Sequence, residues 1–127
     1  MKLTNQQMDE DLYYLTEISA KVSGKLGYYV AKNARILTNE LVEYGKIKDN
    51  LIREYGTADE SGRYSLSMDS PNFAEFATKL QEYSDIECDV NLMMIDPEIV
   101  YDSGLNGQEI SSILFMIKDE EVNDDTQ

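Results

Sequence analysis

The chain has 127 residues, of which 42% are hydrophobic and 28% charged, and its formal net charge is −14. This length suits one domain with one hydrophobic core, and the balance of apolar and charged residues is typical of a folded protein. The lack of histidine removes the commonest general base and metal ligand, the single cysteine excludes an internal disulfide, and the short apolar stretches exclude a membrane-spanning helix.

The first part of the chain predicts two amphipathic helices. Thr4 and Gln7 have the spacing of a capping box, so a helix begins there. Its apolar residues recur in steps of three and four. They are Met8, Leu12, Leu15, Ile18, Val22 and Leu26. Gly24 and Gly27 favour a turn, and a second apolar stripe then runs from Val30 until Gly56 supplies a stop.

The second part predicts shorter elements of both kinds. Alternation over residues 63–68 indicates a short strand, and Pro71 is expected at the first position of a helix. Apolar and polar side chains alternate over residues 86–94, which is the clearest strand signal in the chain. Asn106 and Glu109 form another cap, and the helix that they begin should end near Lys118.

These elements predict one α+β domain over residues 1–118. In it, an N-terminal antiparallel helical hairpin packs on a small two-stranded sheet, with two further helices. The two strands could pair parallel or antiparallel. Residues 119–127 are acidic and lack periodicity, so we expect a flexible tail there.

The sequence does not support most kinds of catalysis. We expect that the protein is not an enzyme and that it holds neither a cofactor nor a metal ion. Cys88 occupies an inward position of the predicted strand, where a small core side chain is the simplest interpretation. Residues 85–91 place oxygen-bearing side chains at every second position and Asp96 stands at the twelfth, as in a calcium loop. A calcium loop, however, needs glycine at its sixth position, where this chain has Val90.

The net negative charge comes entirely from the second half of the chain. Residues 1–58 hold eight basic and eight acidic residues, whereas residues 59–127 hold three basic and 17 acidic ones. Such a field repels nucleic acid and anionic membranes and attracts basic protein surfaces. The partner we expect is therefore a host or phage protein with a basic surface. A purely solubilising role for these carboxylates is the alternative.

A run of carboxylates along the predicted strand and the loop after it forms the candidate partner-binding surface. Its residues are Asp85, Glu87, Asp89, Asp96, Glu98 and Asp102. Carboxylates two residues apart on a strand are separated by about 6.6 Å, which is close to two base-pair rises of duplex DNA. An acidic ladder of this kind could imitate a phosphate backbone, and a solvated outer face would show the same pattern.

The segments MKLTNQQ, YYVAKNARIL, EYG, DESGRY and ILFMIKD together resemble a family of uncharacterised small proteins from tailed phages and prophages of Gram-positive bacteria. The resemblance implies an origin and carries no functional residues. We therefore expect a non-catalytic phage protein in the bacterial cytoplasm that inhibits a host defence or nucleic-acid-binding protein through a DNA-mimic-like acidic surface. The alternative is a virion or assembly accessory acting through the helical hairpin and its exposed tyrosines.

Overall fold

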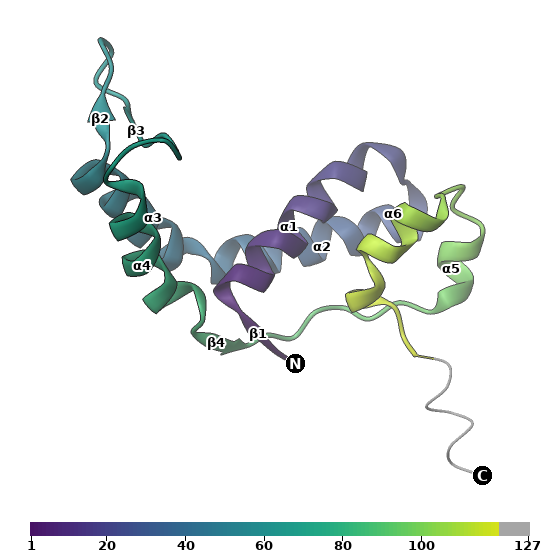
Figure 1. Ribbon diagram of the computed structural model, residues 1–127. Coiled ribbons are helices and arrows are strands. Elements are labelled where there is room, and N and C mark those ends of the chain that lie inside the picture. Colours follow the sequence, from purple (N-terminus) through teal and green to yellow (C-terminus); the bar gives the residue numbers. More distant parts are fainter. Residues whose placement is uncertain (120–127) are drawn as a thin grey trace.

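A computed structural model describes residues 1–119 and has the expected α+β architecture. Helices α1 (Asn5–Ile18) and α2 (Gly24–Glu40) lie side by side at the centre of an elongated, arched molecule (Figure 1). Helices α3 (Val42–Tyr55) and α4 (Phe73–Ser84) pack together at one end, and the short helices α5 (Pro97–Tyr101) and α6 (Gly107–Ser112) lie at the other. The predicted helical hairpin is confirmed.

The turn of the hairpin comes slightly earlier than the glycines suggested. The capping box of Thr4 and Gln7 begins α1 as predicted, and the 3₁₀ turn η1 (Ser19–Lys21) ends it. Gly24 then adopts a φ of +62°, a left-handed conformation that favours glycine, and starts α2. Gly27 therefore lies inside α2 and not in the turn.

The predicted second helix is divided in two at Leu41. Its backbone has φ −88° and ψ 1° there, yet Leu41 N donates to Leu37 O and Gly45 N to Leu41 O. The chain thus bends without losing these hydrogen bonds. The bend has a packing cause, because α2 contacts α1 whereas α3 contacts α4, and one straight helix could not follow both.

The strands pair with partners that the sequence did not indicate. Strand β4 (Glu87–Asp89) is shorter than predicted and pairs antiparallel with β1 (Lys2–Thr4). The strand predicted at 63–68 is reduced to β3 (Tyr64–Ser65), which pairs antiparallel with β2 (Thr57–Ala58). The two predicted strands therefore lie in separate two-stranded sheets. Helix α4 begins at Phe73 with Asn72 at the N-cap position, so Pro71 precedes it and does not occupy its first turn.

The last part of the described chain is more broken than predicted. Residues 97–101 form α5 where we expected a loop. Asn106 and Glu109 cap α6 as predicted, but the helix ends at Ser112 and is followed by the 3₁₀ turn η2 (Leu114–Met116). An isolated parallel bridge joins Ile95 to Ile117. Apart from Asp119, the predicted tail lies outside the described residues.

One hydrophobic core joins the helical hairpin to the C-terminal elements. Its buried residues come from α1, α2, the α2–α3 bend and the segment after β4, together with α5 and η2. They are Met8, Leu15, Ile18, Leu26, Val30, Leu37, Leu41, Tyr44, Val90, Ile95, Val100, Ile113 and Met116. The segment after β4 thus runs across the hairpin, with Val90 and Ile95 buried in the core.

Candidate partner-binding surface

The six predicted carboxylates are exposed, and the structure separates them into two groups. Asp85, Glu87 and Asp89 lie at the end of α4 and on β4, and are called here the β4 group. Asp96, Glu98 and Asp102 lie on or beside α5, and form the α5 group. Residues 90–95 cross the middle of the molecule between them, and Figure 1 places β4 and α5 well apart. The sequence run is therefore not one continuous patch.

In the β4 group, the carboxylate ladder has two members on the strand. Glu87 is opposite Thr4 and Asp89 is opposite Lys2 in the β1–β4 register. These four side chains therefore lie on the same face of the sheet. The N-terminal ammonium lies 3.7 Å from Asp89 Oδ1 and donates a hydrogen bond to Val90 O. The N-terminal ammonium therefore places a positive charge beside Asp89, at one end of this ladder of two carboxylates.

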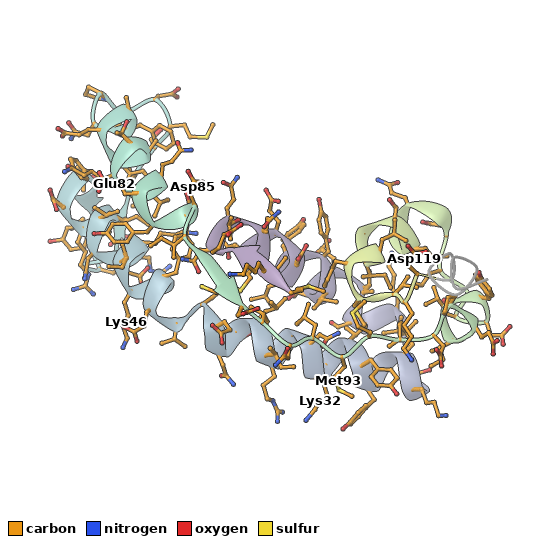
Figure 2. The ribbon with its side chains drawn as sticks, turned by 90° about the horizontal axis from the view of Figure 1, so that it is seen from below. Lys32, Lys46, Glu82, Asp85, Met93 and Asp119 are labelled. Atoms are coloured by element: carbon orange, nitrogen blue, oxygen red, sulfur yellow. The ribbon has the colours of Figure 1, made fainter. Side chains whose placement is uncertain are left out.

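Asp85 belongs to the helix that precedes the strand. It is the C-terminal cap residue of α4, and its Oδ2 accepts a hydrogen bond from Gln81 Nε2 at 3.3 Å. Figure 2 shows Asp85 near Glu82 of the same helix, on the side of the molecule opposite Lys46. The carboxylates at the end of α4 therefore extend the β4 group beyond the strand.

In the α5 group, the three carboxylates have different surroundings. Asp96 is the residue that precedes α5, and its Oδ1 lies 3.2 Å from Lys118 Nζ in an exposed ion pair. Glu98 projects from the first turn of α5. Asp102 lines a small hollow together with Lys21 and Lys25 from the turn of the hairpin. Glu98 is thus the member of this group that has no neighbouring cation among the described contacts.

The cations of the helical hairpin and α3 leave most of this negative charge uncompensated. Lys48 pairs with Asp9 at 2.9 Å and Lys46 with Glu43 at 3.1 Å, so both remain within the balanced half. Among the ion pairs of residues 1–119, Lys21 with Glu109 is the one that links a side chain of the first 58 residues to the acidic half. Figure 2 shows Lys32 and Lys46 directed away from Glu82 and Asp85.

The most perturbed carboxylate lies outside the predicted surface, on α1. Asp11 is half-buried, and the loss of water around its carboxylate, aided by repulsion from Glu10, raises its pKa to about 6. The sequence does not single it out, because Asp11 is the last of three consecutive acidic residues, Asp9 to Asp11, and nothing in the pattern marks one of them as less exposed.

Other candidate chemistry can be placed in the structure. Cys88 is partly buried, with its Sγ 3.9 Å from Asn5 Oδ1. Residues 87–89 of the calcium-like run form a strand. Within residues 1–119, no three acidic or cysteine side chains lie close enough together to form a metal-binding group.

An apolar groove beside the α5 group was missed by the sequence analysis. It has a volume of about 590 Å³ and lies between α5 and η2, so it is called here the α5–η2 groove. Its apolar lining consists of Pro97, Val100, Tyr101, Ile110, Leu114 and Ile117. Ile110, Leu114 and Ile117 have the spacing of one helical face. The sequence therefore indicates that these apolar residues lie together, but it does not indicate that Leu114 is exposed.

Comparison of the chain with protein-family models, with curated proteins and with solved structures finds no match. The resemblance to phage proteins therefore stays a prediction. None of the helices in residues 1–119 combines the length and the hydropathy needed to cross a membrane.

Proposed function

We propose that the chain is a non-catalytic binding protein of phage or prophage origin, acting in the bacterial cytoplasm, whose carboxylates hold a protein with a basic surface. The observation that carries the proposal is that Asp85, Glu87 and Glu98 are exposed and have no cation partner among the ion pairs of residues 1–119. The electrostatic field of an exposed carboxylate is not cancelled when it has no cation partner. Such a field speeds association with basic surfaces and selects against acidic ones.

The two carboxylate groups favour a protein partner over simple imitation of DNA. Imitation of a phosphate backbone needs a row of evenly spaced negative charges. Strand β4 supplies only Glu87 and Asp89, and Lys2 lies opposite Asp89. The α5 group adds charge at a separate place, beside an apolar groove. Charge combined with apolar area is the usual composition of a protein interface. Inhibition of a host defence or nucleic-acid-binding factor is one consequence that such binding could have.

The proposal is tested by capture of host proteins on the immobilised chain at low and high salt. Glu87→Lys with Asp89→Lys alters the β4 group, and Glu98→Lys alters the α5 group. Glu10→Lys with Glu40→Lys is the control for the first pair, because it changes the net charge equally at exposed sites of the balanced half. We expect capture to fall at high salt and in at least one test variant. Equal capture by the test and control variants would contradict the proposal.

A second candidate function follows from the exposed tyrosines of the hairpin. Tyr13, Tyr14 and Tyr28 are 61%, 42% and 57% exposed. Tyrosines offer large contact area at low entropic cost, which suits docking to other phage proteins in an assembly accessory. Mass spectrometry of purified particles separates the two functions, since an accessory retained in the particle is present there in stoichiometric amounts.

A further inference from the structure

The α5–η2 groove combines large exposed apolar side chains with a fixed backbone. Tyr101 is 70% exposed and Leu114 is 58% exposed, whereas Val100 beneath them is 2% exposed. Lone exposed apolar residues are normal, but several around one concavity mark a binding site. The volume of about 590 Å³ falls within the usual range of ligand-binding clefts.

Backbone hydrogen bonds hold one wall of the groove in place. Ile95 N donates to Met116 O and Lys118 N donates to Ile95 O, each at 2.8 Å. These two bonds attach the end of η2 and the residues after it to the segment that precedes α5. The groove therefore needs little rearrangement to accept a ligand, which lowers the cost of binding.

The charge beside the groove is negative overall. Asp96 and Glu98 are the sequence neighbours of Pro97, which lines the groove, and Asp119 lines it beside Lys118, the cation that pairs with Asp96. An apolar cleft with acidic margins complements a segment that carries apolar residues on one face and lysine or arginine beside them.

We propose that the α5–η2 groove binds an amphipathic basic helix of the partner protein, with apolar side chains seated against Leu114 and Tyr101 and basic side chains near Glu98. This inference rests on the proposed function and specifies where and how the partner is held. Burial of Leu114 supplies the affinity, whereas the carboxylates supply orientation and salt dependence.

The test uses the full chain and a fluorescent peptide of leucine and lysine about four helical turns long, with leucine on one face. A scrambled peptide of the same composition and an oligolysine of the same charge are the comparison probes. Fluorescence anisotropy at low and physiological salt measures binding. We expect the amphipathic peptide to bind at least about tenfold more tightly than either comparison probe.

Leu114→Gln should weaken binding of the amphipathic peptide about tenfold, because one buried leucine contact is lost. Met68→Gln is the matched control, since Met68 is 78% exposed and lies between β3 and α4 at the other end of the molecule. Glu98→Gln should weaken binding by a smaller factor that disappears at high salt. Both apolar positions are exposed, so both variants should fold, which circular dichroism verifies.

Four outcomes would overturn the inference. If oligolysine binds as tightly as the amphipathic peptide and Leu114→Gln has no effect, the carboxylates act alone and the proposed function survives without the groove. If removal of residues 120–127 strengthens peptide binding severalfold, the groove is filled by this chain itself. If Leu114→Gln converts a dimer to a monomer in sedimentation, the groove belongs to a second copy. If no basic peptide binds at all, the proposed function fails as well.

Discussion

The buried side-chain amide of Asn33 pairs with the backbone of Met93 in both directions. Its Nδ2 donates to Met93 O at 3.0 Å, and its Oδ1 accepts from Met93 N at 2.7 Å. Asn33 is 0% exposed and lies on α2, whereas Met93 lies in the irregular segment after β4. One side chain thus supplies the hydrogen bonds that a neighbouring strand would provide, and it fixes the segment that separates the two carboxylate groups.

Replacing Asn33 with leucine should destabilise the fold by about 2 kcal/mol. The backbone N–H and C=O of Met93 would both lose their hydrogen-bond partner, and the leucine side chain would keep water from replacing it. Urea denaturation measures the change. Asn39→Leu, at an exposed position of the same helix, should stay within about 0.5 kcal/mol of the parent. Hydrogen exchange adds a local readout, since the Met93 amide should exchange faster in the Asn33 variant. An unchanged exchange rate there would show that the bond is not formed in solution.

Local signals in the sequence were sufficient for several helix boundaries. The capping boxes of Thr4 with Gln7 and Asn106 with Glu109 need contacts only within four residues, and both are present. The partner of β4 could not be predicted in this way. Strand β1 has three residues and no alternation to mark it. The pairing also depends on Asn5, whose backbone N donates to Ile86 O and whose Nδ2 donates to Tyr83 O.

The exposure of Glu87 and Asp89 was predictable from alternation, but the division of the six carboxylates into two groups was not. The division depends on the bond between Asn33 and Met93, which joins residues 60 positions apart. The groove was missed for a related reason. A continuous helix would have buried Leu114 with Ile110 and Ile117, but the change to a 3₁₀ turn at η2 rotates Leu114 outward, to 58% exposure.

Asp11→Asn should stabilise the protein at pH 7 and not at pH 4. The pKa of Asp11 is about 6 in the folded chain, above its ordinary value of 3.8, so the folded state binds the proton more tightly than the unfolded state. This carboxylate therefore lowers the free energy of unfolding as pH rises from about 4 to 6, and the penalty persists above that range. Because its side chain is only half-buried, we expect the variant to gain about 1 kcal/mol at pH 7.

Urea denaturation at both pH values, with the parent and the variant measured together, isolates this effect from the other carboxylates. Glu17→Gln removes an exposed carboxylate from the same helix and serves as the control. A gain for Asp11→Asn that is the same at pH 4 and pH 7 would mean that the effect does not come from ionisation.

Gly56 lies between α3 and β2, with the backbone of Ser65 on β3 close beside it. A Cβ added there would collide with Ser65 O and would lie 2.5 Å from Ile52 O, so part of the backbone would have to move. We expect Gly56→Ala to lower the free energy of unfolding by about 2 kcal/mol, as overpacking usually does. Gly45→Ala is the matched control, because Gly45 lies inside α3 with nothing within 4 Å of an added Cβ. That change should raise stability by up to about 1 kcal/mol, since alanine is the better helix former. Thermal denaturation of the two variants beside the parent should therefore shift the midpoint in opposite directions, and a rise in both would place the β2–β3 hairpin farther from α3 than described here.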